Sequence, residues 1–142
     1  MSNIPENLIK DMINKAISAR EYAYTPYSNF KVGAALLTGN DEIITGCNIE
    51  NAAYSPGNCA ERTAVFKAVS QGIKDFKGIA IVAGKDKGQL EYTSPCGMCR
   101  QVLREFVTPS DFYVIMARSE DDYKIMTLEE LFPMSFGPDN LR

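Results

Sequence analysis

Short apolar runs alternate with segments of helical periodicity along this chain, and that alternation limits the folds it can adopt. Apolar side chains recur on one helical face in three segments, 7–24, 59–71 and 96–106. Four other apolar runs are short enough to be buried strands, at 30–37, 42–49, 77–84 and 111–117. Strands alternating with helices predict an α/β layered fold, and a hairpin of the first two strands makes its sheet mixed.

Local signals mark where the predicted elements end. Pro26 disfavours a helical residue before it and so ends the first helix. The sequence TGND at 38–41 is typical of the turn in a hairpin, and Gly72 favours a helix stop. Thr127 and Glu130 stand in capping-box spacing, which predicts a last short helix.

The composition fits one globular domain spanning residues 1–142. Of these residues 45% are hydrophobic and 23% are charged, unlike in disordered proteins. The net charge of −3 argues against a nucleic-acid partner, because such proteins usually present a basic face. No apolar run is long enough to span a membrane, and the first residues lack the apolar core of a secretory signal. We therefore expect a cytoplasmic protein whose cysteines are reduced.

Three of the four cysteines are placed where they could bind a metal ion. Cys59 and the pair Cys96 and Cys99 stand at the starts of two predicted helices, and the chain contains no histidine. A helix N-terminus carries partial positive charge, which lowers a thiol's pKa and favours the thiolate that binds metal. Three thiolates leave the fourth position of a tetrahedral zinc ion open, as in catalytic sites.

Charged residues beside these cysteines could serve the same chemistry. Glu61 lies two residues after Cys59, where its carboxylate could reach a zinc-bound water rather than the ion. Three thiolates give the site a net negative charge, which disfavours hydroxide. Arg62 and Arg100 stand next to ligands, each in a position to hydrogen-bond sulfur and offset that charge. All three could equally be ordinary charged residues on a helix.

Other interpretations of the cysteines remain open at this point. Any single cysteine could be a small buried apolar residue. If Cys47 supplied a fourth ligand, four thiolates would form a closed structural zinc site within a binding module. The C-x-x-C of Cys96 and Cys99 could also be a redox dithiol, although Cys59 and Glu61 have no task in that chemistry.

Five motifs in order make the chain resemble the small, homotetrameric zinc-dependent cytidine deaminases. They are FKVGAALL (30–37), GCNIENAAY (46–54), CAERTA (59–64), SPCGMCRQ (94–101) and SFGP (135–138). The resemblance covers nearly the whole chain and implies a three-layer α-β-α sandwich around a mixed five-stranded sheet. It also implies hydrolytic deamination of cytidine and deoxycytidine to uridine and deoxyuridine in pyrimidine salvage, with one Zn²⁺ per subunit.

The same resemblance implies roles for individual residues around the metal. Cys59, Cys96 and Cys99 would bind zinc, and Glu61 would carry protons between water and the base. Cys47 has no role in this family pattern and stays a small buried residue.

Further residues would hold the substrate in that family pattern. Asn48 and Glu50 would hydrogen-bond the ribose, since residues two apart in an extended segment point the same way. Phe30 would flank the pyrimidine. Backbone groups next to Ala60 and at 94–95 would bind its polar edge.

The expected partners are a small nucleoside and further copies of this chain, with no nucleic acid and no membrane. Phe136 would reach into a neighbouring subunit's pocket, and Tyr54 would contact across the same interface. A deaminase of a related compound such as blasticidin S shares the zinc signature and remains a rival. Deamination of polynucleotides is disfavoured by the acidic pI of about 5.0.

Overall fold

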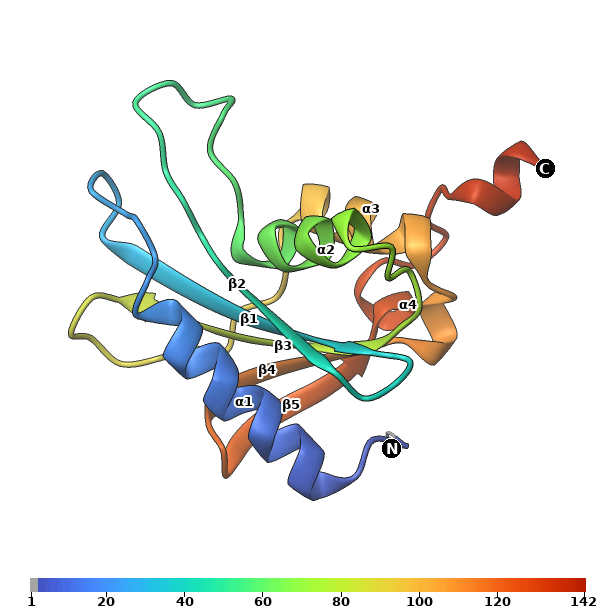
Figure 1. Ribbon diagram of the computed structural model, residues 1–142, viewed down its shortest axis with the longest axis horizontal. Coiled ribbons are helices and arrows are strands. Elements are labelled where there is room, and N and C mark those ends of the chain that lie inside the picture. Colours follow the sequence, from blue (N-terminus) through green and yellow to red (C-terminus); the bar gives the residue numbers. More distant parts are fainter. Residues whose placement is uncertain (1–2) are drawn as a thin grey trace.

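The computed structural model describes residues 3–142, which form one five-stranded sheet with helices on both faces (Figure 1). The main elements are α1 (Glu6–Arg20), β1 (Phe30–Thr38), β2 (Ile43–Cys47), α2 (Ala60–Ser70), β3 (Phe76–Lys85), α3 (Gly97–Phe106), β4 (Tyr113–Ser119), β5 (Asp122–Thr127) and α4 (Leu128–Leu131). Two short 3₁₀ helices, η1 and η2, cover Pro109–Asp111 and Pro138–Leu141. None of the helices in residues 3–142 combines the length and the apolar character of a membrane span.

The sheet has the strand order β2-β1-β3-β4-β5. β1 pairs antiparallel with both β2 and β3, whereas β3 pairs parallel with β4 and β4 antiparallel with β5. A parallel pair needs a crossover connection, which α3 supplies here, so the carboxyl ends of β3 and β4 lie at one edge of the sheet. The mixed five-stranded sheet confirms the predicted fold class.

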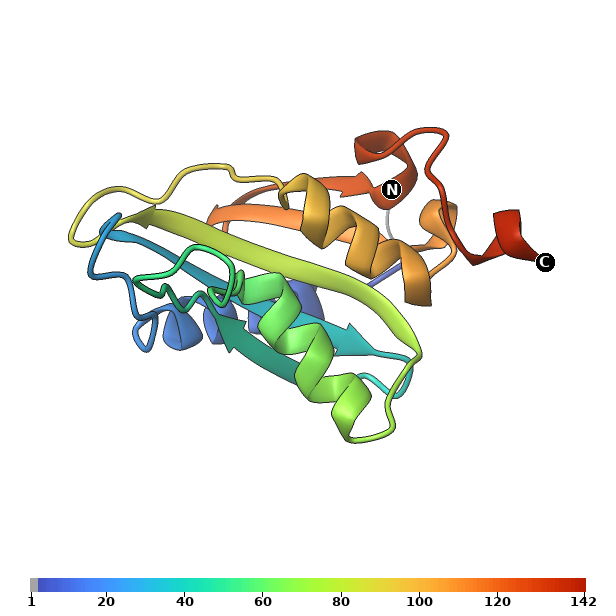
Figure 2. The same cartoon turned by 90° about the horizontal axis from the view of Figure 1, so that it is seen from above.

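Alternate residues of β1 belong to two separate cores, one on each face of the sheet. Ala34 and Leu36 pack in the core shared with α2 and α3, whereas Ala35 and Leu37 pack in the core shared with α1. All four are fully buried, as expected for a central strand covered on both faces. The two views show α1 on one face and α2 and α3 on the other (Figure 1, Figure 2). This arrangement is the predicted three-layer sandwich.

Gly46 of β2 allows α2 to approach the sheet closely. A Cβ built at this position would lie 2.5 Å from the carbonyl oxygen of Ala60 and 2.6 Å from the backbone nitrogen of Ala64. Real side chains do not tolerate such distances to backbone atoms, so the first turn of α2 can lie here only over a glycine. Because Cys59 is the N-cap of that helix, Gly46 also determines how close the Cys59 thiol lies to the sheet.

The first helix ends at Arg20 rather than at the predicted Tyr24. The backbone N–H of Tyr24 donates to the carbonyl of Asn48 at 3.0 Å, and the N–H of Glu50 donates to the carbonyl of Tyr24 at 2.8 Å. This parallel bridge to the segment after β2 satisfies the backbone of Tyr24 outside the helix. The pairing partner is distant in sequence, so a local pattern could not reveal it.

The strand β5 lies outside the apolar runs of the sequence and was implied only by the family resemblance. It has one neighbour, β4, and none of its residues is fully buried. An edge strand of mixed polarity therefore gives no continuous apolar signal. The short helix that follows it was predicted correctly, because Thr127 and Glu130 form both hydrogen bonds of the capping box.

Candidate metal centre and active site

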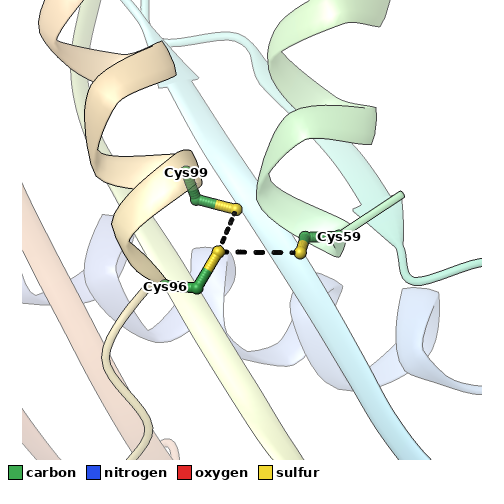
Figure 3. A group of neighbouring side chains, drawn as sticks. All are labelled: Cys59, Cys96 and Cys99. Atoms are coloured by element: carbon green, nitrogen blue, oxygen red, sulfur yellow. Dashed lines mark hydrogen bonds between the residues drawn. The ribbon is translucent and has the colours of Figure 1, made fainter. Parts of the chain in front are cut away.

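Three cysteine thiols converge between the first turns of α2 and α3 (Figure 3). Cys59 is the N-cap of α2, Cys96 is the N-cap of α3, and Cys99 lies in the first turn of α3. The Sγ atoms of Cys59 and Cys96 are 3.8 Å apart, and those of Cys96 and Cys99 are 3.4 Å apart. All three sulfur atoms lie within 4.8 Å of one another.

These thiols fit a zinc ion in both spacing and chemistry. With Zn–S bonds near 2.3 Å and tetrahedral angles, two sulfur ligands stand about 3.8 Å apart. Soft thiolate donors favour zinc among the common divalent ions, and two helix N-termini favour the thiolate form. Among residues 3–142, Cys47 is outside this group of possible ligands. The arrangement is therefore a three-sulfur site and not the closed four-cysteine site that the sequence left open.

The surroundings of Cys59 and Cys99 shift the pKa values of these two thiols in opposite directions. A hydrogen bond from the Cys99 thiol, reinforced by the Arg62 guanidinium, lowers the pKa of Cys59 to about 5. The neighbouring Cys59, followed by burial, raises the pKa of the Cys99 thiol. Arg62 Nη2 lies 3.2 Å from the sulfur of Cys59. The predicted hydrogen bond from Arg62 to sulfur is thus present, and it favours a thiolate at position 59.

Glu61 is buried beside the thiols, in the first turn of α2. Its side chain is only 5% exposed and lines the same cavity as Cys59 and Cys96. Burial is the main cause that raises the pKa of Glu61 to about 7. A carboxyl group in such a place can both accept and release a proton near neutral pH.

The cavity beside the thiols has a volume of about 710 Å³ and is open to solvent on one side. Two predicted contacts of the substrate, Pro95 and Phe136, are not among the residues that line it. Its wall contains Ser94 and five further predicted contacts, which are Phe30, Asn48, Glu50, Tyr54 and Ala60. They come from the start of β1, the segment after β2 and the first turn of α2. A cavity of this size, with an aromatic wall and a few polar groups, can hold a small polar molecule.

Asn48 and Glu50 both line the cavity and also bind the protein backbone. Asn48 Oδ1 accepts a hydrogen bond from the N–H of Val32, and its Nδ2 donates to the carbonyl of Phe30, each at 2.9 Å. These two bonds fix the start of β1. Each amide atom retains the capacity for one more hydrogen bond.

The carboxylate of Glu50 holds the turn before β1. It accepts hydrogen bonds from the N–H groups of Tyr27 and Ser28, at 3.0 and 3.1 Å, and from the hydroxyl of Ser28. The Ser28 hydroxyl, followed by the backbone donors, lowers the pKa of Glu50. The sequence suggested only a substrate-binding role, whereas the structure shows that Glu50 also positions the turn that carries Phe30.

The prediction that Arg100 donates a hydrogen bond to sulfur is wrong. Its guanidinium donates to the carbonyls of Pro95 and Leu131, at 2.8 and 2.5 Å, and to the hydroxyl of Ser94 at 3.0 Å. The guanidinium of Arg100 thus binds three acceptors other than sulfur and positions the segment before Cys96. Of the two arginines, Arg62 is the one that donates to sulfur.

Phe136 lies outside the cavity of its own chain. Its side chain is 58% exposed, and its backbone carbonyl accepts a hydrogen bond from Gln101 Nε2 at 2.9 Å. Arg104 Nε donates to the hydroxyl of Ser135 at 2.9 Å. Two side chains of α3 therefore hold the C-terminal segment in place while the ring of Phe136 projects away from the core.

Several cavity residues were missed by the sequence analysis, among them Ser28, Val32, Ile81 and Thr93. Val32 follows Phe30 by two positions on β1, so strand alternation alone places both on the same face. Ile81 is paired with Ala34 across the β1–β3 pair, so its place near the start of β1 depends on the strand register and not on a local pattern. Thr93 stands before the C-x-x-C motif in a loop with no periodic signal.

Comparisons with known proteins agree on one family. The family model of the cytidine and deoxycytidylate deaminase zinc-binding region matches residues 6–116. A cytidine deaminase of Sporosarcina psychrophila is 47% identical over 133 residues, which cover 94% of each chain. A crystal structure of cytidine deaminase from Burkholderia pseudomallei is 43% identical, with a TM-score of 0.78 over 89% of this chain and 97% of that chain. The cytidine deaminase of Mycobacterium tuberculosis gives 33% identity and a TM-score of 0.77 over 95% and 99% of the two chains.

Proposed function

Because this chain belongs to the cytidine and deoxycytidylate deaminase family, we propose that it hydrolyses cytidine and deoxycytidine to uridine and deoxyuridine, with release of ammonia. One observation carries the proposal beyond the family. Three thiols converge, and two of them, Cys59 and Cys96, line the same open cavity as the buried carboxyl group of Glu61. A metal site with a free position and an adjacent acid–base group is what hydrolysis at a ring carbon requires.

The metal is zinc, held by Cys59, Cys96 and Cys99. When bound, the ion supplies Lewis-acid activation of water. The chain itself provides the conditions around it. Two helix N-termini and Arg62 offset the negative charge of three thiolates, so that the site still favours loss of a proton from water.

Glu61 carries the protons of the reaction. Its carboxylate takes a proton from the attacking water and delivers it to N3 of the pyrimidine while the water oxygen adds to C4. It then transfers the second proton to the exocyclic amine, the C4–N bond breaks, and ammonia leaves. The burial of Glu61 supports this role, because bulk water has little access to a proton held there.

The cavity wall binds the nucleoside in the proposed mechanism. Phe30 flanks the pyrimidine, and backbone groups next to Ala60 and at 94–95 bind its polar edge. Asn48 and Glu50 bind the ribose hydroxyls with the hydrogen-bonding capacity that their backbone contacts leave free. The position of the three side chains of Phe30, Asn48 and Glu50 in one wall supports these roles.

The proposal extends to the oligomeric state and the cellular location of the protein. Residues 1–142 act as one catalytic domain in a homotetramer, in which Phe136 and Tyr54 complete the site of a neighbouring subunit. The exposure of both rings, 58% and 101%, supports such contacts. The reaction serves pyrimidine salvage in the cytoplasm, a reducing compartment that suits the four free cysteines.

An ultraviolet assay of cytidine and deoxycytidine tests the proposal directly. The purified protein is assayed as isolated, after removal of metal with a chelator, and after addition of Zn²⁺. We expect turnover that disappears with the metal and returns with zinc. Blasticidin S and single-stranded DNA are assayed in parallel. Turnover of blasticidin S in place of both nucleosides would assign the rival substrate, and no turnover of any of them would refute the proposal.

A further inference from the structure

Tyr92 connects the loop before α3 to the hairpin that is formed by β4 and β5. It lies in the segment 86–96, between β3 and α3. Its hydroxyl donates a hydrogen bond to Asp122 Oδ1. Two cations lie over its ring, with Arg118 Cζ at 5.2 Å and Lys124 Nζ at 4.6 Å from the centroid. These partners all belong to β4 and β5.

The acceptor of this hydrogen bond is itself held in place. Arg118 Nε lies 3.3 Å from Asp122 Oδ2, so the guanidinium and the phenol each take one oxygen of the carboxylate. A hydrogen bond to an ionised acceptor is stronger than one between neutral groups. The same bond raises the pKa of Tyr92, which keeps the phenol protonated as a donor. The two cations over the ring add a second attraction to the same hairpin.

The residues next to Tyr92 form part of the cavity wall. Thr93 and Ser94 line the cavity, three and two residues before the proposed ligand Cys96. On the C-terminal side, Arg100 binds the Ser94 hydroxyl at 3.0 Å and the Pro95 carbonyl at 2.8 Å. This short stretch of wall is thus fixed at one end by α3 and at the other by Tyr92 together with Glu91, whose N–H donates to the carbonyl of Ala83 at 2.8 Å.

We propose that Tyr92 is a positioning residue for substrate binding, which holds the Thr93–Ser94 wall of the cavity through the β4–β5 hairpin. The inference rests on the proposed function. It assigns to Tyr92 an effect on nucleoside affinity and none on the metal, because Cys96 and Cys99 are placed by α3 itself. Asp122 acts as the fixed end of the same contact.

A double-mutant cycle with Tyr92→Phe, Asp122→Ala and the combined variant tests this role. Tyr92→Phe keeps the ring and its cation contacts and removes only the hydroxyl. We expect each single variant to raise KM for cytidine about threefold to tenfold, with kcat within about twofold of the parent. The combined variant should raise KM no more than the more affected single variant does, because both changes remove the same hydrogen bond, between Tyr92 and Asp122. Zinc content should stay the same in all of them.

Hydrogen exchange of the loop supplies a measurement that needs no substrate. The backbone amide of Glu91, which donates to the carbonyl of Ala83, should exchange faster in Tyr92→Phe than in the parent, since the anchored segment opens more often. Asp11→Ala is the matched control, because Asp11 is an exposed carboxylate paired with Lys15 at 3.1 Å on α1. That control should change neither KM nor exchange in the loop.

The outcomes separate this inference from the proposed function. If the parent deaminates cytidine and the variants keep its KM, the inference is wrong and the function stands. A fall in kcat together with loss of zinc would also overturn it, because Tyr92 would then support the metal site. If the parent shows no turnover, the proposed function fails, and unchanged exchange of the Glu91 amide in Tyr92→Phe would still overturn the anchoring role.

Discussion

Glu61 combines two properties that rarely occur together in one side chain. It lies at the start of a helix, where carboxylates are normally exposed, yet it is 5% exposed and faces a cavity lined by metal ligands. Burying a carboxyl group is unfavourable unless hydrogen bonds or opposite charges compensate for its lost hydration. The proposed role of Glu61 as a proton carrier accounts for an acid at this position.

Replacing Glu61 with Gln should abolish most turnover and leave the fold intact. Glutamine has the same shape but cannot accept and release a proton, so kcat should fall by a factor of about 10² to 10⁴. The measurements are steady-state kinetics and elemental analysis for zinc, which should remain bound. A variant with near-normal kcat would show that another group carries the proton.

The cysteines differ in their expected contribution to metal binding. Cys96→Ala should lose zinc, because only two sulfur ligands remain. Cys47→Ser is the matched control, since Cys47 lies outside the ligand group and should retain one zinc per chain. Elemental analysis of both purified proteins decides the matter. Loss of metal from Cys47→Ser would instead support a closed four-cysteine site.

Residue chemistry was predictable where it depended on short sequence spacing. Cys96 and Cys99 lie one helical turn apart, so the pattern alone placed them together, and Glu61 followed from its distance to Cys59. The partners of Arg100 were not predictable, because one of them, the carbonyl of Leu131, lies 31 residues away. The second function of Glu50, as a clamp on the turn before β1, depends in the same way on tertiary contact.

At the scale of elements, the active site depends on how closely α2 approaches β2. Replacing Gly46 with Ala would place a methyl group 2.5 Å from the Ala60 carbonyl, so the helix start must shift. We expect a loss of unfolding free energy of about 1–3 kcal/mol, together with weaker zinc binding, because Cys59 moves with the helix. Thermal unfolding and zinc titration measure the two effects.

Gly97→Ala is the matched control for this change. Gly97 stands in the first turn of α3, and a Cβ built there meets no atom within 4 Å. Alanine at this position should therefore leave both stability and zinc affinity close to those of the parent. If Gly46→Ala behaved like Gly97→Ala, close packing of α2 on β2 would not be what sets the position of Cys59.

The elements were predicted well where an apolar pattern was continuous and less well where pairing was distant. β1 and β3 are central strands with long buried runs, and their positions were predicted to within two residues. The end of α1 and the whole of β5 depended on pairing with segments that no local pattern specifies. The sheet order needed the register between strands, which the sequence implied only through the family resemblance.

At the scale of the whole molecule, the proposed tetramer makes each active site a product of more than one chain. If Phe136 completes a neighbour's pocket, Phe136→Ala subunits and Glu61→Gln subunits carry complementary defects. Mixed oligomers formed by co-expression should regain activity, because some sites then combine an intact Glu61 with an intact Phe136 from different chains. Activity should exceed that of either variant alone. Strictly additive activities would show that each chain forms its site by itself.

The ligand set is divided between Cys59 and Cys96, which lie 37 residues apart. A bound ion therefore closes a loop that contains the whole of α2, the whole of β3 and the segment with Tyr92. Such closure acts as a reversible cross-link that restricts the unfolded chain, as a disulfide does, but one that a chelator can remove without reduction. An ion bound by these cysteines would thus also link metal supply to the lifetime of the folded protein.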